Sequence, residues 1–366
     1  MVIILKKILF LGLLILIFFI YTNKLEEPPK IEIDNEDYYH VSLFAVGDNL
    51  IHNTIYESAY VNGTYDFIPI YKEVKPLIRQ YDLKFINQET ILGGKEIGLS
   101  TYPAFNSPHE LGDALVDAGF NLISIANNHT LDRGEKAILS AINYLDSKAV
   151  IYSGAVKSEN MSHVKLFNLK GIKFAFVAYT YGTNGIAHPG GKEYLANVYS
   201  NSKARNDIIK IRDLVDVVIV SMHWGEEYQE YPSTTQKEQA KYLSENGVDI
   251  IIGHHPHVIQ PIDIINSKDR DTLVIYSLGN FLSDQKGIDR LVGMGVGVDL
   301  YKGKKSEEIS LKNLNATLFY RYKDNNNTFK IKLYHDLNND YLNDYLLHFE
   351  NKSKLIKTYN KNIEVK

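Results

Sequence analysis

The sequence predicts a mixed α/β domain preceded by one N-terminal transmembrane anchor, and two observations lead to this fold class. From Val41 onward, short apolar runs rich in Val, Ile and Phe alternate with amphipathic stretches, the pattern of strands and helices that follow one another. Residues 8–21, in contrast, are uncharged and strongly apolar. A chain of 366 residues, 45% hydrophobic and 23% charged, can bury one large core or two modest ones, which excludes a disordered protein.

Residues 1–24 are the predicted membrane anchor. Lys6 and Lys7 precede the apolar stretch, and counting residues 2–5 together with snorkelling of these lysines brings its length close to the about 20 residues that a membrane span needs. The residues after Ile20 lack the small side chains of a signal-peptide cleavage site, so we favour an uncleaved anchor over a cleaved signal peptide. The positive-inside rule then places the N-terminus in the cytoplasm and the main domain outside the cell, with the cell membrane as a partner.

Residues 25–40 are rich in proline and acidic residues and are predicted to be a linker, after which residues 41–345 form the domain. Seven apolar runs are expected to be strands, at residues 41–46, 83–86, 122–126, 174–178, 217–221, 249–252 and 273–276. Amphipathic stretches predict helices near residues 70–80, 110–118, 135–145, 204–214 and 237–245.

Other signals concern helix ends and the C-terminal part of the chain. Gly119 and Gly247 each follow a helical pattern and suit left-handed C-terminal caps. Residues 292–335 alternate between apolar and polar side chains, which predicts antiparallel strands. Residues 346–366 are expected to be a basic C-terminal tail, either a solvated helix or a frayed end.

Charge and cysteine content exclude several functions. The formal net charge of -4 gives no basic field, so we expect no nucleic-acid partner. The chain has no cysteine, which excludes lipidation of an N-terminal cysteine, disulfides and thiolate metal sites. Any metal ion must therefore be held by oxygen and nitrogen atoms.

Almost every predicted parallel strand runs directly into a cluster of side chains of the types that bind metals. The clusters are Gly47-Asp48-Asn-Leu-Ile-His52, Asn87-Gln-Glu89, Ala126-Asn-Asn-His129 with Asp132, His223-Trp-Gly-Glu-Glu227, Gly253-His-His-Pro-His257 and Ser277-Leu-Gly-Asn280. The carboxyl ends of parallel strands deliver several loops to one crevice. We therefore expect these segments to converge.

Each cluster alone also has a structural interpretation. A Gly-Asp pair after a strand is more often a turn than a ligand, and Asn127 or Asn128 can simply adopt a left-handed turn conformation. His223 can be a core histidine. His255 and His257 are harder to explain in this way, because residues two apart in an extended chain point to the same side. Taken jointly, the clusters favour a metal site.

The combined ligand set is chemically coherent. Carboxylates and imidazoles with an asparagine oxygen suit Mn, Zn or Fe. Two divalent metal ions about 3.5 to 4 Å apart would share one carboxylate, polarise a phosphoryl or acyl oxygen and activate a water molecule. A nearby histidine that is not a ligand could protonate the leaving group.

These segments resemble the calcineurin-like metallophosphoesterases broadly and the bacterial CapA, or poly-γ-glutamate capsule synthesis, family closely. The motifs that carry the resemblance lie between Val41 and Phe281 and read FAVGDNLIH, FINQET, IANNHTLDRG, MHWGEEY, IIGHHPHVIQPI and IYSLGNF. The resemblance implies a metallophosphoesterase-like layered β-sandwich flanked by helices.

The resemblance also implies a division of labour among the site residues. It gives Asp48, Glu89 and His257 to one metal ion, Glu89, Asn128, His223 and His255 to the other, and the role of acid catalyst to His129. Further candidate site residues are His52, Asn127, Asp132, Glu227, His254 and Asn280. The usual Asp-x-His of the first motif is absent, and Glu89 stands where phosphoesterases generally have aspartate. One metal site is therefore expected to be weak, singly occupied or completed by His52.

The expected function is that of a membrane-anchored extracellular protein of capsule or poly-γ-glutamate biosynthesis or export, with a dinuclear metal site of the hydrolase type. The expected partners are an anionic surface polymer, such as poly-γ-glutamate or other capsule material, and capsule synthase or export subunits. Two alternatives stay open: a non-catalytic polymer-binding or scaffold subunit, and a secreted sugar-binding domain without metal.

Overall fold

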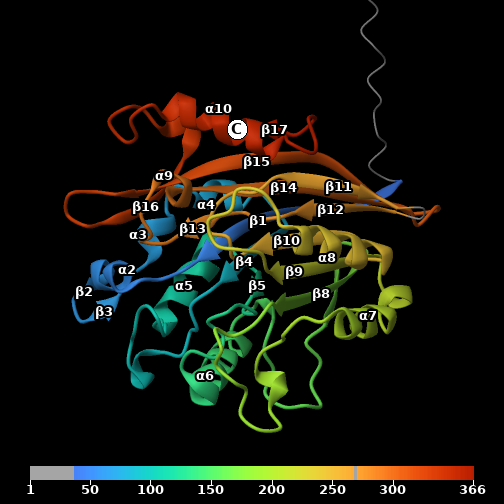
Figure 1. Cartoon of the computed structure of the whole chain (residues 1–366), viewed down its shortest axis with the longest axis horizontal. Helices are drawn as coiled ribbons and strands as arrows, with labels where there is room; N and C mark the ends of the chain where they lie inside the picture. The colour runs from blue at the N-terminus through green and yellow to red at the C-terminus, as the bar shows by residue number, and fades with distance from the viewer. Residues whose placement is uncertain (1–36, 268–269) are drawn as a thin grey trace, which may run out of the picture. The chain divides into compact units, whose positions relative to one another are not determined.

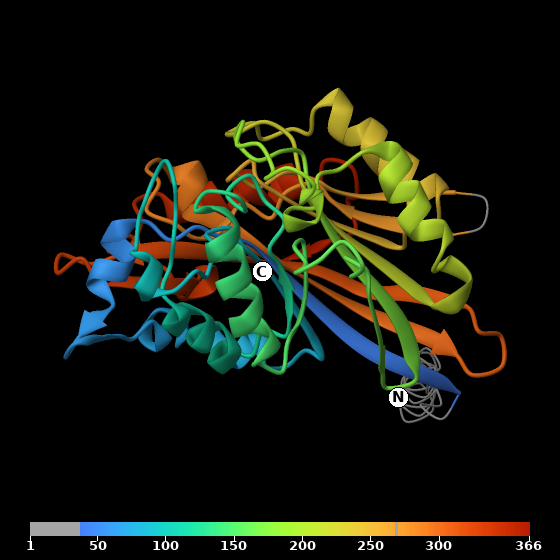
Figure 2. The same ribbon diagram turned by 90° about the horizontal axis from the view of Figure 1, so that it is seen from below.

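Two β-sheets lie face to face at the centre of the fold (Figures 1 and 2). The computed structural model describes residues 37–267 and 270–366, and Tyr39–Lys366 form one compact unit. Within the described residues, the larger sheet has the order β16-β15-β14-β1-β4-β5-β6, with β13 paired to β1 and β17 paired to β15. The smaller sheet has the order β11-β12-β10-β9-β8-β7. The mixed α/β class is therefore confirmed.

The seven predicted strands are all present, together with others. The larger sheet contains β1 (Tyr38–Asn49), β4 (Leu83–Gln88), β5 (Leu122–Ser124), β6 (Ile151–Ser153), β13 (Asn280–Leu282), β14 (Val292–Gly303), β15 (Ile309–Lys323), β16 (Phe329–Leu333) and β17 (Glu364–Val365). The smaller sheet contains β7 (Lys165–Leu169), β8 (Ile172–Thr180), β9 (Val217–His223), β10 (Ile250–His254), β11 (Ile262–Asn266) and β12 (Asp271–Ile275). A separate hairpin joins β2 (Tyr60–Val61) to β3 (Thr64–Tyr65). β14, β15 and β16 pair in antiparallel fashion, as predicted.

Helices cover the outer faces of both sheets. The α-helices are α2 (Asn53–Ser58), α3 (Ile68–Tyr71), α4 (Lys75–Ile78), α5 (His109–Ala118), α6 (Gly134–Asp146), α7 (Asn201–Ile209), α8 (Thr234–Glu245), α9 (Ile288–Leu291) and α10 (Tyr345–Ile356). Short 3-10 helices span Lys95–Ile97, Glu193–Leu195, Arg212–Leu214 and Tyr334–Asp336. α5 and α6 pack on the larger sheet and α7 and α8 on the smaller one, which gives four layers.

Alternation along each strand explains this layering. In β8, Phe174 and Phe176 point into the core between the sheets, whereas Val177 and Tyr179 point toward α7 and α8. In β4, Phe85 faces the same inner core and packs edge-on against Phe176, with ring centroids 6.1 Å apart. Successive side chains of a strand point to opposite faces, so a strand with both faces covered is apolar throughout.

The predicted helix boundaries are correct in part. Gly119 and Gly247 have φ values of 114° and 95°, the left-handed conformation expected after a helix end. The prediction of one helix over residues 70–80 is wrong, because this stretch is divided between α3 and α4, and α4 carries Pro76 in its first turn. The predicted helix over residues 204–214 ends at Ile209, and a separate 3-10 turn follows.

The C-terminal segment packs more closely than a frayed tail. α10 and β17 lie alongside β15 (Figure 1), and β17 pairs with it. Ile356 and Ile363 are buried in the same hydrophobic core as side chains of β14 and β15.

At the other end, β1 begins at Tyr38, so the last residues of the predicted linker already belong to the sheet. The predicted anchor, residues 1–24, lies outside the described residues. Among residues 37–267 and 270–366, no helix combines the length and the hydrophobicity that crossing a membrane requires.

Candidate metal centre

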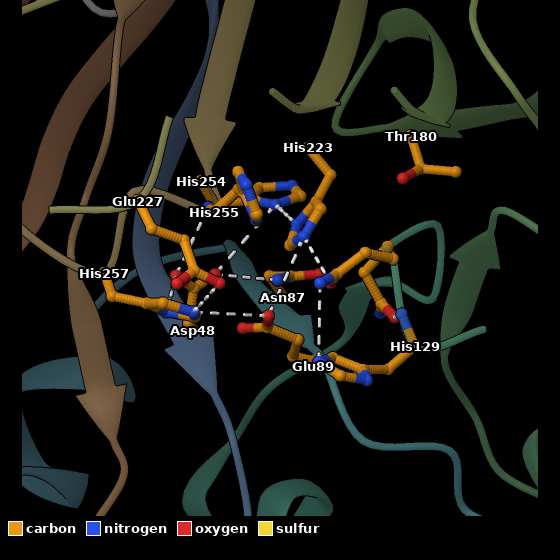
Figure 3. Close-up of polar contacts among 12 residues, drawn as sticks. Asp48, Asn87, Glu89, His129, Thr180, His223, Glu227, His254, His255 and His257 are labelled. Carbon is orange, nitrogen blue, oxygen red and sulfur yellow. Dashed lines mark hydrogen bonds and ion pairs between the residues drawn. The ribbon is translucent and has the colours of Figure 1, made fainter. Parts of the chain in front are cut away.

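The predicted clusters come together where strands of both sheets end (Figure 3). Asp48 lies near the end of β1, Glu89 directly follows β4, and His223 and His254 are the last residues of β9 and β10. β1 and β4 are parallel neighbours in one sheet, and β9 and β10 are parallel neighbours in the other. The carboxyl ends of parallel strands in both sheets thus supply the site, as the rule for α/β sheets predicts.

Asp48 is fully buried and surrounded by donors. Its Oδ1 accepts a hydrogen bond from Asn87 Nδ2 at 2.8 Å, and its Oδ2 lies 3.1 Å from His257 Nδ1. Burial raises the pKa of Asp48, but the hydrogen bond and charge of His257, together with His254 and Asn87, outweigh burial, so the net pKa lies below its ordinary value. The preceding residue must be glycine, because a Cβ on Gly47 would overlap the carbonyl oxygen of Gly279.

Glu89 is the most unusual side chain of the site. It is fully buried, and neither carboxylate oxygen has a hydrogen-bond partner. Its Oε1 lies 3.7 Å from His223 Nε2 and 3.7 Å from His257 Nε2. Burial, followed by the charge of Asp48, raises the pKa of Glu89 well above its ordinary value.

His255 and His257 lie on a strained loop after β10. Both have positive φ values, 102° and 60°, which non-glycine residues rarely adopt and which concentrate at functional sites. His257 Nδ1 faces both Asp48 Oδ2 and Asn280 Oδ1, at 3.0 Å from the latter, so the proton on this nitrogen points to acceptor oxygens. Glu227, which is half-exposed, has its Oε1 4.0 Å from that Nε2.

His129 stands at the rim with a fixed orientation. Its Nδ1 donates to Asp132 Oδ2 at 2.7 Å, and the same oxygen accepts the backbone N–H of Phe105. The other ring nitrogen, Nε2, faces Asn128 Nδ2 at 3.4 Å. This arrangement presents Nε2 of His129 toward the buried side chains, as expected of an acid catalyst next to a ligand.

Asn128, His223 and His254 line the opposite wall of the site. Asn128 Oδ1 lies 2.8 Å from His223 Nε2, and His223 Nδ1 lies 2.7 Å from His254 Nδ1. Burial lowers the pKa of His254 to about 4 and that of His255 to about 3, and it lowers the pKa of His223 as well. These imidazoles are therefore neutral near pH 7, the form that binds metals.

The structure groups the donor atoms differently from the division that the resemblance implied. Asp48 lies with His223 and His254, and Glu89 lies with His255 and His257; within each group the donor atoms are less than 4.8 Å apart.

Two candidate residues have structural partners instead. His52 Nδ1 accepts the backbone N–H of Asp284 at 3.2 Å, and His52 belongs to neither donor group of the described residues. Asn127 shapes the turn before His129, because its Oδ1 accepts the backbone N–H of His129 and its Nδ2 donates to the backbone of Gln88.

Three residues near the site were not predicted. Ser221 Oγ lies 2.6 Å from His254 Nε2. Tyr181 and Asn184 follow β8; the Tyr181 ring packs against His255 at 4.8 Å between centroids, and Asn184 Oδ1 accepts from Asn128 Nδ2. The signal was available, because β8 is a predicted parallel strand whose carboxyl end reaches the same edge.

The side chains fit a divalent metal ion. In the described part of the chain, the ion-pair partners of the buried carboxylates Asp48 and Glu89 are all histidines. Buried carboxylates without cationic partners are costly, and a metal ion satisfies them. His255 Nδ1 is a further buried atom without a hydrogen-bond partner. The protein thus belongs to the class of layered α/β proteins that have buried oxygen and nitrogen donors compatible with metal binding.

Sequence comparison identifies the family within this class. Residues 42–285 match the model of the bacterial capsule synthesis protein PGA_cap, and the chain belongs to that family. It is 33% identical over 238 residues to the capsule biosynthesis protein CapA of Bacillus anthracis, a match that covers 62% of this chain and only 51% of that protein. It is 28% identical over 276 residues to the PGA biosynthesis protein CapA of Bacillus subtilis, with 71% and 67% of the two chains covered.

A solved structure shows a weaker likeness. A crystal structure described as a novel phosphatase of Mycoplasma pneumoniae aligns with 77% of this chain and 94% of its own, with a TM-score of 0.46 and 14% identity. The family assignment rests on the sequence matches.

Proposed function

We propose that this chain is a metal-dependent hydrolase of capsule or poly-γ-glutamate production, with a metallophosphoesterase-like fold and a centre for two divalent metal ions. The observation that carries the proposal is the carboxylate of Glu89. It is buried without a hydrogen bond, and its Oε1 lies 3.7 Å from the Nε2 atoms of both His223 and His257. A carboxylate between two sets of imidazoles is suited to bridge two cations.

We adopt the division of ligands that the family resemblance implies, although the donor atom of Asp48 lies with those of His223 and His254, and that of Glu89 with those of His255 and His257. Asp48, Glu89 and His257 would hold one ion, and Glu89, Asn128, His223 and His255 the other. Mn, Zn and Fe all suit this mixture of oxygen and nitrogen donors. Two such ions supply Lewis acidity toward a phosphoryl or acyl oxygen and lower the pKa of water.

His129 is the residue that moves a proton. Because Asp132 accepts the Nδ1–H, the other nitrogen is the one that can donate to the oxygen or nitrogen of a leaving group. The buried carboxylate of Asp132 also stabilises the protonated ring. Neither Asp132 nor His129 is needed to hold a metal ion in this scheme.

The names of the relatives support the biological role. Both Bacillus proteins are named for capsule or PGA biosynthesis. We therefore place the substrate bond, a phosphoester or an amide or ester bond, in an anionic surface polymer such as poly-γ-glutamate or in its precursor. Residues 1–24 would anchor the domain at the outer face of the cell membrane, beside capsule synthase or export subunits.

A non-catalytic polymer-binding or scaffold subunit is the second candidate function, because the first motif lacks a ligand. Leu50, buried and apolar, stands where the metallophosphoesterase pattern has a histidine. The neighbouring Asn49 turns away from the donors and bonds Gln88 and Tyr71. A centre with fewer imidazoles around Asp48 could bind a polyanion through its cations without turning it over.

Metal content tests the centre itself. The full-length chain and the variants Asp48→Ala and His257→Ala are purified, and bound metals are counted by mass spectrometry. His335→Ala, a change in an exposed histidine, is the matched control. About two metal ions per wild-type chain, with fewer in both site variants, supports the dinuclear centre. A folded protein that takes up neither Mn nor Zn would refute it.

His129→Asn separates the two candidate functions. General acid catalysis typically contributes about 10²- to 10⁴-fold, so a hydrolase should lose turnover of phosphoester or γ-glutamyl substrates while its metal content is unchanged. Wild-type polymer production by cells that carry the variant would instead favour the scaffold.

A further inference from the structure

A row of four buried polar side chains crosses the wall of the candidate metal centre. Ser221 Oγ lies 2.6 Å from His254 Nε2, His254 Nδ1 lies 2.7 Å from His223 Nδ1, and His223 Nε2 lies 2.8 Å from Asn128 Oδ1. The exposed fractions of the four residues are 0%, 0%, 0% and 2%. Figure 3 shows the rings of His223 and His254 side by side.

Strand register sets this row. β9 and β10 are parallel neighbours in which His223 pairs with His254 and Ser221 pairs with Ile252. Ser221 and His223 are two residues apart in β9, so their side chains point to the same face. The sheet therefore holds Ser221, His223 and His254 in place, whereas Asn128 lies in the turn after β5.

Proton positions in the row follow from the acceptor at its end. A neutral imidazole has one N–H and one lone pair. Asn128 uses its Nδ2 to donate to Asn184, so the amide oxygen faces His223 and can only accept. Without a metal ion, His223 thus carries its proton on Nε2, His254 donates from Nδ1, and the Ser221 hydroxyl donates to His254 Nε2.

We propose that Ser221, His254 and His223 form a hydrogen-bond relay that reverses its direction when a divalent cation takes the Nε2 lone pair of His223. The inference rests on the proposed metal centre. In the loaded direction, His223 donates from Nδ1 to His254 Nδ1, His254 donates from Nε2 to Ser221 Oγ, and the serine hydrogen turns away. Each ring moves one proton between its own two nitrogens, so the protein neither gains nor loses a proton in the row.

The relay makes His254 a positioning residue and not a metal ligand. His254 Nδ1 lies 2.7 Å from His223 Nδ1 and 4.0 Å from Asp48 Oδ1. When a cation is bound at His223, the lone pair of His254 Nδ1 therefore accepts the hydrogen bond from His223 and is not free to bind a metal ion. Outer hydrogen bonds of this kind fix the tautomer of a ligating histidine.

Side-chain NMR tests the reversal. The full-length chain is labelled with ¹⁵N-histidine, and long-range ¹H–¹⁵N spectra are recorded without metal and with ¹¹³Cd²⁺. When Cd²⁺ binds, we expect the proton of His223 to move from Nε2 to Nδ1 and that of His254 to move from Nδ1 to Nε2. We also expect a ¹¹³Cd coupling to His223 Nε2 and none to either nitrogen of His254. An unchanged His254 tautomer in the loaded protein, or a ¹¹³Cd coupling to His254 Nδ1, would overturn the relay while leaving the metal centre standing. A protein that binds no Cd²⁺ at all would overturn both.

Variants add a readout that does not depend on activity. His254→Leu removes the acceptor for His223 Nδ1 and should weaken Cd²⁺ and Zn²⁺ binding about 10- to 100-fold in calorimetry. His254→Asn retains a side-chain oxygen near the position of Nδ1 and should recover most of that loss. Ser221→Ala should weaken binding as well, whereas the matched control Ser124→Ala removes a buried hydroxyl without a partner and should change nothing. Wild-type affinity in both His254→Leu and Ser221→Ala would refute the role of the row.

Discussion

Replacing Glu89 by methionine should stabilise the metal-free protein and remove its response to metal ions. Methionine has a similar length and can occupy the same buried space, but it carries no charge and no oxygen that needs a partner. Both oxygens of Glu89 lack hydrogen bonds, and burial with the charge of Asp48 raises its pKa. The native side chain is therefore unfavourable until a cation arrives.

The size of the effect follows from that burial. An unsatisfied buried polar group costs about 1–3 kcal/mol, so Glu89→Met should raise the free energy of unfolding by about that amount. Each kcal/mol corresponds to roughly 1–2 °C in Tm for a domain of this size, because the unfolding entropy is about 2.1 cal/mol/K per residue. The gain should grow as pH rises above the ordinary carboxyl range, because the unfolded chain then releases a proton that the folded chain retains, and wild-type stability falls.

Thermal and chemical unfolding check both parts of this prediction. Wild-type protein should gain about 2.7 kcal/mol at a metal concentration 100 times Kd, whereas the variant should gain almost nothing. Glu135→Met, a change in a surface residue that pairs with Lys192, serves as the control and should shift stability by less than about 0.5 kcal/mol. A metal-free Glu89→Met protein less stable than wild type, or one that metal ions stabilise as strongly, would refute the reasoning.

Three further predictions concern other parts of the molecule. Burial lowers the pKa of His163 to about 3, so the wild-type protein loses stability as pH falls below about 6.5, the ordinary histidine pKa. His163→Leu lacks this loss, so its free energy of unfolding should rise by about 2 kcal/mol relative to that of wild type between pH 7 and pH 5 in urea unfolding. The same pH dependence in both proteins would contradict this. Gly47→Ala should destabilise the fold by about 1–3 kcal/mol or more, because its Cβ would overlap a backbone oxygen, whereas Gly190→Ala, which lies in open space, should be neutral. Equal Tm values for the two variants would refute the close contact at Gly47. Asp132→Asn should lower turnover about 10²- to 10⁴-fold with unchanged metal content, because it no longer stabilises the protonated ring of His129, and full turnover would show that this pair is not used.

The location of the site could be predicted from the sequence because it depends on a local rule. Each strand ends in polar residues, and parallel strands present their carboxyl ends at one edge. Asp48, Glu89, His223 and His257 were found in this way, and the structure places them within a few ångströms of one another. Strand periodicity, the types of side chain that follow each strand and the rule for parallel strand ends were enough for this part.

Sheet membership could not be predicted in this way. The runs that became β4 and β9 are both short and mostly apolar, yet they belong to different sheets. Which strands pair is decided by long-range packing of side chains, and a single sequence does not record that packing. The contact between His254 and His223 could not be predicted for the same reason, because only the register of β10 against β9 places the two rings together.

The position of β1 in the larger sheet bears on how the chain folds during its synthesis. β1 ends at residue 49 and lies between β4 and β14, and β14 begins only at residue 292. Until the ribosome has made that distant strand, β1 has one open edge, which is a site for mispairing and aggregation. Contacts of such high sequence separation also form slowly. The larger sheet can therefore close only when most of the polypeptide has been synthesised, and a chain truncated before β14 should be a substrate for chaperones and proteases instead of a smaller folded protein.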